Sequence, residues 1–445
     1  MINLSLKQKC VYLIKVIVFI IIFFGLTKIV AFLCKDDANS YARTLFHEFY
    51  EQENIDYLVC GASHVSHGLE ANIAGEYFEK NVFNTGTPSQ KIDGTYAIIR
   101  QASELYNIEK VFLELDFSIA CSPAFSERTG FTSEYIVSNG IKDYKIKTDF
   151  LLNCSKPKYY LNAFLPIGKD KLMTLNPKKI FGKIKSIITG EYLKYTYKDS
   201  DSEYAGKGCV LDLDEIPNGG YCNDKKEKPI PVDDISDDWI HTIENIISFC
   251  KEKNIELIFF SMPCSDFYLN ERANYDEYYS FCYDFVTKQG FKYYDFNLIK
   301  PELLSLEDSD FQDDNHLSKK GVYKWTDFFC DFFSTKYLES NGIEKYFYSS
   351  YKEKMNAQED KIFGLYLIPS SNKQTVEIIP VQNHKTINGI TYDIYTIIDN
   401  EEVPVAQKTE NNIITLPSGK NGKIRVVSYI NDNKQNDCIQ SFVGF

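Results

Sequence analysis

The stretch Asp56-Tyr-Leu-Val-Cys-Gly-Ala-Ser-His64 decides the fold that we expect for this chain of 445 residues. Its apolar run Tyr57–Cys60 is short, as in a buried strand, and a glycine follows it. Ser63 comes soon after that glycine, so we expect its hydroxyl to lie at the mouth of a sheet. A serine in such a place is usually a turn residue or a helix N-cap, so Ser63 needs a partner before it indicates chemistry.

The partner that the sequence offers is His316, in the stretch Asp313-Asp-Asn-His316. An aspartate three residues before a histidine lies on the same local turn, where its carboxylate can orient the imidazole. A serine hydroxyl is a weak nucleophile at neutral pH and requires such a base, whose tautomer a third group fixes. We therefore predict Ser63 as nucleophile, His316 as base and Asp313 as the orienting group. Asp314 is the alternative orienting group, although spacing favours Asp313, and helix capping is the alternative role for the whole turn.

Strand-like and helix-like segments alternate on both sides of these motifs, which predicts an α/β domain whose parallel sheet lies between helices. The expected strands are residues 57–60, 81–84, 110–115, 255–261 and 292–296, and the expected helices are residues 41–52, 69–78, 92–106, 238–253, 274–289 and 319–333. Residues from about 120 to 230 are rich in Tyr, Lys, Ser and Gly. We expect them to form an insertion beside the site.

The chain changes character near residue 349. After a helix-like segment at 351–358, short alternating runs are separated by polar turns, a pattern typical of a small β-sandwich. The expected strands are residues 362–368, 375–379, 390–397, 412–416, 423–429 and 438–442. The sequence thus predicts an N-terminal segment 1–35, an α/β domain 36–348 and a β-rich module 349–445.

Residues 11–34 are almost wholly apolar and are interrupted by Lys15 and Lys28. If both lysines reach towards the lipid headgroups, the segment is long enough to cross a bilayer, which needs about 20 residues. We interpret it as an uncleaved transmembrane anchor. A cleaved signal peptide is the alternative, although no clear small-x-small site follows. Basic residues precede the apolar core and acidic residues follow it: Lys7, Lys9 and Lys15 before, Asp36 and Asp37 after. The positive-inside rule therefore predicts a single-pass membrane protein with a cytoplasmic N-terminus and the bulk of the chain outside.

Composition argues against several partners. Lys+Arg 49 against Asp+Glu 62 give a formal net charge of −13, and such a surface repels a phosphodiester backbone, so we expect no nucleic acid. The 12 cysteines include no Cys-x-x-Cys pair, which excludes the usual zinc and redox motifs. Cys209 and Cys222, on either side of a Gly-rich loop, are the disulfide candidates. His64 and His67 share one loop but have no third ligand near in sequence, so we expect neither metal nor cofactor.

Three short motifs, taken in order, resemble those of the SGNH/GDSL hydrolase superfamily and of its membrane-anchored branch in particular. Gly61-Ala-Ser-His64 looks like the nucleophile block of proteins similar to the D-alanyl-lipoteichoic acid transfer protein and to polysaccharide O-acetylation factors. Asn84-Thr-Gly86 resembles the second block and Asp313-x-x-His316 the last. The resemblance covers roughly residues 50 to 335. It implies a three-layer, flavodoxin-like parallel sheet with a Ser-His-Asp triad.

The resemblance also implies an oxyanion hole made by the amides of Ser63 and Gly86. One departure matters, because the family's third block, Gly-x-Asn-Asp, is replaced here by Glu114-Leu-Asp-Phe-Ser118. The Asn that normally donates to the oxyanion is missing, and an ionised Asp116 opposes negative charge. Ser118 is the candidate replacement donor. Losing one oxyanion donor costs roughly 10²–10³ in rate.

In function, the resemblance implies a membrane-anchored, extracytoplasmic acyltransferase or esterase that acts on acyl esters of a cell-envelope polysaccharide. A membrane-bound O-acyltransferase is the implied partner and acyl donor. His64, Asn84 and Asp116 are possible residues of the pocket. The alternative is a non-catalytic envelope scaffold that keeps the fold and binds glycan through the insertion and the β-rich module.

Overall fold

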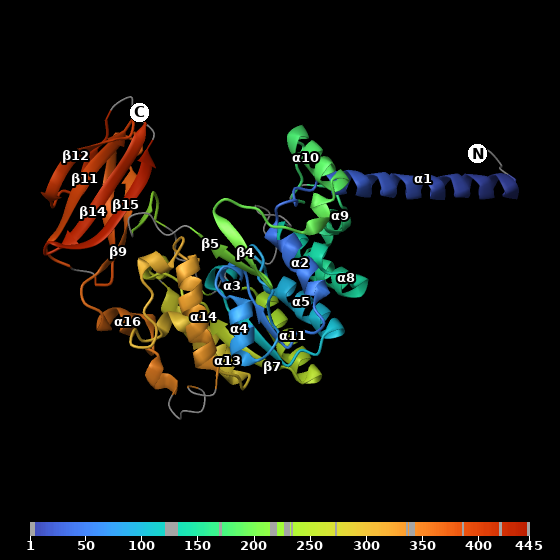
Figure 1. Cartoon of the computed structure of the whole chain (residues 1–445), viewed down its shortest axis with the longest axis horizontal. Coiled ribbons are helices and arrows are strands. Elements are labelled where there is room, and N and C mark those ends of the chain that lie inside the picture. Colours follow the sequence, from blue (N-terminus) through green and yellow to red (C-terminus); the bar gives the residue numbers. More distant parts are fainter. Residues whose placement is uncertain are drawn as a thin grey trace.

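The protein is built around a parallel sheet of five strands in the order β2-β1-β3-β7-β8 (Figure 1). The computed structural model describes residues 5–120, 132–168, 171–213, 220–226, 232, 235–271, 274–334, 337, 343–384, 387–417 and 421–442. The strands of the sheet are β1 (Tyr57–Cys60), β2 (Val82–Asn84), β3 (Lys110–Glu114), β7 (Glu256–Ser261) and β8 (Tyr293–Asp295). Each neighbouring pair in this sheet is parallel. The predicted α/β class with a central parallel sheet is confirmed.

Helices cover both faces of the sheet, as its short and almost wholly buried strands require. One face carries α5 (Ile92–Leu105), α11 (Asp237–Lys253) and α13 (Tyr275–Lys288), and the other carries α4 (Ala71–Phe78) and α14 (Lys319–Phe333). Phe112 of β3 packs against Phe329 and Phe333 of α14, with ring centroids 5.0 Å apart in both pairs. Tyr96 of α5 packs on Phe249 of α11. These strands and helices begin and end within two residues of their predicted bounds.

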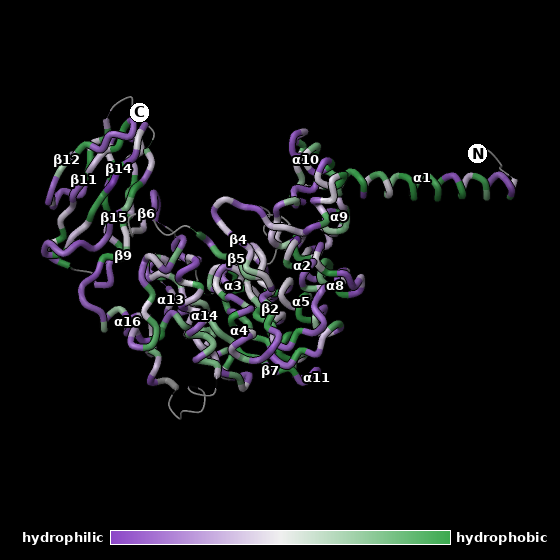
Figure 2. The backbone as a smooth tube through the Cα atoms, viewed as in Figure 1, coloured by the Kyte–Doolittle hydropathy of each residue, from purple (hydrophilic) through white to green (hydrophobic). Residues whose placement is uncertain are grey.

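The N-terminal helix α1 (Leu6–Cys34) stands away from the rest of the protein and is apolar along most of its length (Figure 2). Its 29 residues extend about 43 Å at 1.5 Å per residue, which exceeds the roughly 30 Å hydrocarbon core of a bilayer. The expected apolar segment is therefore one helix, long and apolar enough to span a membrane. Helix α2 (Tyr41–Glu51) follows it and packs on the sheet through Phe49, whose ring lies 5.5 Å from that of Phe83.

The region between β3 and α11, predicted as an insertion, is made of short elements. Within it, residues 121–131, 169–170, 214–219, 227–231 and 233–234 lie outside the described part of the chain. Its described elements are α6 (Phe117–Ala120), α7 (Thr132–Gly140), α8 (Tyr144–Asn153), η1 (Pro157–Tyr159), α9 (Tyr160–Phe164), α10 (Pro177–Ile188), η2 (Glu191–Lys194), β4 (Ser202–Gly206), β5 (Cys209–Asp212) and β6 (Tyr221–Asn223). Helices α9 and α10 lie at the base of α1 (Figure 1). Strand β5 reaches the sheet end that carries Ser63, where Asp212 is hydrogen bonded to His67.

The C-terminal part forms two four-stranded sheets, in the orders β13-β10-β9-β6 and β12-β11-β14-β15. Helix α16 precedes them, and the bounds are α16 (Tyr351–Ala357), β9 (Ile362–Pro369), β10 (Thr375–Gln382), β11 (Ile390–Ile398), β12 (Glu401–Thr409), β13 (Ile413–Thr415), β14 (Gly422–Ile430) and β15 (Asn433–Phe442). A second hydrophobic core lies between the two sheets. Strand β6 comes from the insertion and pairs in parallel with β9, so the module includes a strand from outside residues 349–445. Strand β12 is missing from the predicted strands because it is mostly exposed, polar and interrupted by Pro404.

The disulfide considered between Cys209 and Cys222 is not formed, because both residues are free thiols. Cys209 is buried in the main core of the α/β domain. Cys222, on β6, lies in the C-terminal module, where its thiol donates a hydrogen bond to the carbonyl oxygen of Ile439 at 3.4 Å. The predicted Cys209–Cys222 disulfide is wrong because β6 leaves the α/β domain and pairs with β9 of the C-terminal module. Two cysteines that are near in sequence therefore lie at different cores.

Candidate active site

Ser63 is the first residue of the short helix α3 (Ser63–Ser66), which starts soon after β1 ends. It lies at the carboxyl end of the parallel strands, the edge at which open α/β sheets place their sites. Gly61 is required in this turn, because a Cβ there would lie 2.3 Å from Glu114 Oε2 and 2.4 Å from Val65 Cγ2. The close approach of β1 to β3 therefore explains the glycine that precedes the serine.

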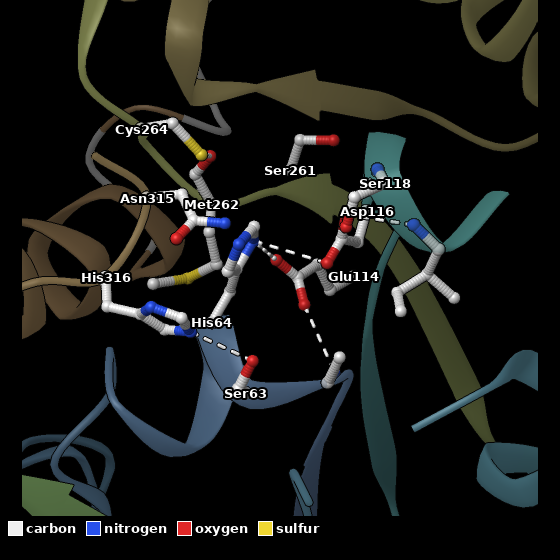
Figure 3. A network of polar contacts seen from close by, with 12 residues as sticks. Ser63, His64, Glu114, Asp116, Ser118, Ser261, Met262, Cys264, Asn315 and His316 are labelled. Carbon is white, nitrogen blue, oxygen red and sulfur yellow. Dashed lines mark hydrogen bonds and ion pairs between the residues drawn. The ribbon is translucent and has the colours of Figure 1, made fainter. Parts of the chain in front are cut away.

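A chain of hydrogen bonds connects Ser63 to two residues that are distant in sequence (Figure 3). Ser63 Oγ lies 2.9 Å from His316 Nε2, although 253 residues separate them. The other ring nitrogen, Nδ1, lies 2.9 Å from Asp313 Oδ2. The structure thus brings together the three residues for which the sequence predicts the roles of nucleophile, base and orienting group.

The turn before His316 explains why Asp313, and not Asp314, faces the imidazole. Asp313 Oδ1 accepts the backbone N–H groups of Asn315 at 3.0 Å and His316 at 2.7 Å, which fixes the carboxylate beside the ring. The backbone carbonyl of Asp314 instead accepts the hydroxyl of Ser265. Burial raises the pKa of Asp313, but the hydrogen bonds and the charge of His316 outweigh it and hold the pKa below its ordinary value. An ionised Asp313 keeps the proton on Nδ1 and leaves Nε2 to take the proton of Ser63.

His64 is buried beside this triad and is held by two carboxylates from the end of β3 (Figure 3). Its Nδ1 lies 3.3 Å from Glu114 Oε1 and 3.4 Å from Asp116 Oδ2. Burial opposes the charged form of His64, but the charges of Asp116 and Glu114 outweigh that cost and raise the pKa of His64 to about 9. The ring centroids of His64 and His316 are 5.3 Å apart. A cation is therefore fixed next to the predicted base at neutral pH.

Two of the predicted oxyanion donors are hydrogen bonded elsewhere. Gly86 donates its N–H to Asn84 Oδ1 at 3.0 Å. Ser118 donates both its hydroxyl and its amide to Asp116 Oδ1, at 2.8 and 2.7 Å, and Figure 3 shows it beyond Asp116 as seen from Ser63. The structure therefore does not bring Ser118 to the nucleophile, because the neighbouring carboxylate binds it. The amide of Ser63, at the start of α3, has no acceptor in the described part of the chain.

Asn84, which the sequence suggests as a pocket residue, is instead fully buried behind the site. Its Nδ2 donates to the carbonyl oxygens of Val65 at 2.6 Å and Leu69 at 3.0 Å. Those carbonyls belong to α3 and to the loop after it. Asn84 therefore holds the segment that carries Ser63, and its Oδ1 holds Gly86.

Sequence patterns miss two partnerships at this site. Glu114 ends an otherwise apolar strand, and a carboxylate at that position was the available signal for a buried cationic partner. His67 Nδ1 lies 2.7 Å from Asp212 Oδ2, and the ring of His67 lies 5.4 Å from that of His316. Asp212 comes from β5, in the insertion, where no pattern in the sequence marks it.

His64 and its two carboxylate partners are also of the types that bind metal ions. The potential ligand atoms of His64, Glu114 and Asp116 lie within 4.8 Å of one another. Protonated His64 neutralises one of the two carboxylate charges and contacts both groups, so a metal ion must compete with that proton. A cavity of about 10 Å³ lies beside them, which is room for about one water-sized group. The cluster is thus internally paired without a metal.

The triad lies at an open surface. The side chains of His316 and Asp313 are 22% and 43% exposed, and Ser63 is half-buried. The two larger cavities, of about 450 and 660 Å³, are lined by other residues. A large or polymeric substrate can therefore reach the serine without entering an enclosed cavity.

No protein-family model matches the chain, and no curated protein matches it. The chemistry assigned to this site therefore depends on the geometry of its own residues.

Proposed function

We propose that the protein is a membrane-anchored, extracytoplasmic serine esterase or O-acyltransferase of SGNH type that acts on acyl esters of a cell-envelope polysaccharide. The observation that carries this proposal is the hydrogen-bond chain from Ser63 through His316 to Asp313. Such a chain raises the nucleophilicity of a serine hydroxyl. If Ser63 were only a turn residue and Asp313 only a helix cap, neither role would require a histidine that bonds to both.

In the proposed reaction, His316 Nε2 takes the proton of Ser63 as Oγ bonds to the ester carbonyl carbon. The tetrahedral intermediate then loses the alcohol of the donor, and His316 returns the proton to the departing oxygen. A sugar hydroxyl or water attacks the acyl-enzyme, with His316 again as base, and Ser63 is restored. Asp313 stays ionised throughout and stabilises the imidazolium.

The negative charge of the tetrahedral intermediate requires hydrogen-bond donors or positive charge. The Asn that donates in the resembled family is absent from this chain, so other groups must stabilise that charge. The Ser63 amide is one available donor at the start of α3. Protonated His64 is a second source of positive charge, held in place by Glu114 and Asp116. The charge of Asp116 is partly offset, because its oxygens accept hydrogen bonds from Ser118 and face His64, which also pairs with Glu114. The proposed site thus uses a fixed cation where the family uses a neutral amide.

The surroundings of the triad support a large acceptor close to a membrane. The site is open, and α1 is apolar and long enough to anchor the chain. In this proposal a membrane-bound O-acyltransferase supplies the acyl group. The net charge of −13 favours a neutral or amino-sugar polymer over an anionic one.

A fluorophosphonate probe applied to the full-length protein tests the proposal. We expect labelling of the wild type and none of Ser63→Ala. Ser66→Ala is the matched control, because the Ser66 hydroxyl is on the same turn but bonds to Tyr41 OH and to the Ser63 carbonyl oxygen, both at 3.1 Å, rather than to His316. A folded wild type that the probe does not label rules out the enzyme.

A non-catalytic envelope scaffold is the second candidate function, and one observation favours it. The amide of Gly86 and the hydroxyl of Ser118 are both engaged, which leaves one neutral oxyanion donor from the predicted set. Such a scaffold would bind glycan through the insertion and the C-terminal module. It predicts an unlabelled wild type and equal glycan binding by wild type and Ser63→Ala.

A further inference from the structure

Helix α10 (Pro177–Ile188) turns its apolar face outward and buries a lysine, the reverse of an ordinary surface helix. Its apolar residues recur at helical spacing: Ile180, Phe181, Ile184, Ile187 and Ile188. Phe181 and Ile188 are 67% and 80% exposed, whereas Lys183 is 4% exposed. Ile180, Ile184 and Ile187 are half-buried, so Phe181 and Ile188 are the part of this face that the described chain leaves uncovered.

The buried lysine fastens α10 to the base of α1. Lys183 Nζ donates to the carbonyl oxygens of Phe32 at 2.6 Å and Lys35 at 2.9 Å, and to Asp37 Oδ1 at 2.7 Å. Figure 1 shows α10 beside the point where α1 joins the domain. Because Phe32 lies in the last turn of α1, the middle of α10 lies at the end of the membrane-spanning segment, where lipid headgroups begin.

The composition of α10 and its flanks fits a membrane interface. Leu175, just before the helix, and Leu193, just after it, are also exposed. The polar side of the helix carries three exposed lysines: Lys178, Lys179 and Lys185. Helices that lie in a membrane interface combine such an apolar face with basic residues.

A cavity of about 450 Å³ lies at the same place, between the end of α1, α2 and the insertion. Four cationic side chains line it: Lys28, Lys35, Arg43 and Lys142. The carboxylate on its wall is Asp37, which is already paired with Lys183 at 2.7 Å. In the described part of the chain, no carboxylate pairs with Lys28, Arg43 or Lys142. Lys35 shares Asp37 at 3.3 Å, whereas Arg43 and Lys142 contact tyrosine rings, which leave their charges unneutralised. In a protein of net charge −13, this is a local excess of positive charge.

We propose that α10 lies in the membrane interface with its apolar face towards the acyl chains, and that the cavity beside it takes the phosphate headgroup of an anionic phospholipid. This inference rests on the proposed insertion of α1 into the membrane. Exposed Phe181 and Ile188 leave water on insertion, and the cationic side chains attract an anionic headgroup at the membrane surface. Two contacts with lipid, α1 and α10, fix the orientation of the α/β domain above the bilayer.

Quenching of tryptophan fluorescence by brominated lipids tests the placement of α10 in the full-length protein, reconstituted in phosphatidylcholine vesicles. Phe181→Trp reports on α10 and Phe19→Trp on the middle of α1. Tyr283→Trp on α13 is the matched control, because Tyr283 is exposed but distant from α1 (Figure 1). Native Trp239 and Trp325 are buried, so the wild type supplies the background.

We expect quenching in F181W and F19W and none in Y283W. Quenching in F19W without F181W overturns the proposal and leaves the anchor standing. Absence of quenching in both overturns the anchor together with the proposal. Fluorophosphonate labelling of Ser63 in the same vesicles measures the proposed chemistry separately.

A second measurement tests whether the cavity binds the headgroup of an anionic phospholipid. In F181W, brominated phosphatidylglycerol as a minor component should quench about twofold more than the same fraction of brominated phosphatidylcholine. The added substitutions K28Q and K142Q should remove this preference, while K288Q and K292Q, remote from α1, should keep it. Equal quenching by the two lipids overturns the headgroup site. Loss of the preference when soluble glycerol phosphate is added also overturns it, and assigns the cavity to a free phosphate.

Discussion

The sheet edge that carries Ser63 and the C-terminal pair of sheets bury different kinds of side chain. At the sheet edge, three ionisable groups are buried against one another: His64, Glu114 and Asp116. The core between the C-terminal sheets is mainly aliphatic, and the buried carboxylate of that module, Asp437, is neutralised by Arg425 and Lys434, both at 2.8 Å. Burying charges costs free energy unless they are paired, and strongly perturbed groups gather at functional sites. The difference supports placing the proposed chemistry in the α/β part rather than in the module.

Substitution of His316 gives the sharpest test of this contrast. His316→Ala is expected to lower ester hydrolysis by about 10⁴-fold or more, because Ser63 loses its general base. His67→Gln is the matched control, since His67 lies beside His316 but pairs with Asp212, and we expect less than about tenfold loss there. Initial rates on an aryl ester measure both. Equal losses in the two variants would mean that the whole histidine cluster, and not one base, supports the reaction.

Removal of the orienting carboxylate should have the next largest effect. Asp313→Asn favours the wrong tautomer of His316 and is expected to lower the rate by about 10³-fold. Asp314→Asn should lower it by less than about threefold, because Asp314 contacts Ser265 through its backbone. The ratio of the two rates shows which aspartate orients His316. A greater loss in Asp314→Asn than in Asp313→Asn would contradict the choice of Asp313.

Charged His64 predicts a pH-dependent stability that the C-terminal core does not share. Its pKa is raised from 6.5 to about 9, so its stabilisation is fully present below pH 6.5 and is lost as the pH rises through about 9. Urea unfolding should show His64→Gln destabilised by at most about 3 kcal/mol near pH 6, with the difference shrinking towards pH 9. Glu114→Gln should flatten the same profile, because it removes one of the two carboxylates. A difference that grows with pH would show that His64 is neutral in the folded protein.

Removal of the C-terminal sheets should have the smallest effect on the serine. Deletion of residues 360–445 removes the buried residues of the second core and leaves β6 without its partner β9. We expect fluorophosphonate labelling of Ser63 within about threefold of the full-length rate. Thermal stability should fall, because Phe267 stacks on Tyr221 and contacts Tyr366 of the lost β9. A truncated chain that keeps its circular dichroism and loses labelling would place part of the site in the module.

The parts predicted correctly are those that local patterns determine. The run Tyr57–Cys60 and the helix Lys319–Phe333 have the bounds expected from apolar periodicity. The turn Asp313–His316 was also predictable, because its hydrogen bonds join residues within three positions of each other. Strand β12 was not, since an exposed edge strand carries little apolar alternation.

Partners that come from different strands were not predictable in the same way. The contact of His64 with Glu114 depends on β1 and β3 being neighbours in a defined register. The binding of Ser118 by Asp116 is different, because it joins residues two positions apart and follows the local capping pattern of a short helix. The place of Cys222 depends on β6 joining β9.

By itself, the sequence determined the membrane-compatible helix, the order of strands and helices, and the three residues from which a triad is built. Periodicity, glycine positions and short turns encode these features locally, so they survive without knowledge of the fold. The tertiary structure alone decided that Ser63 and His316 lie 2.9 Å apart and that His64 is buried beside them between Glu114 and Asp116. Those outcomes depend on which strands pair and on which groups compete for the same hydrogen bond, and only the packed chain settles that competition.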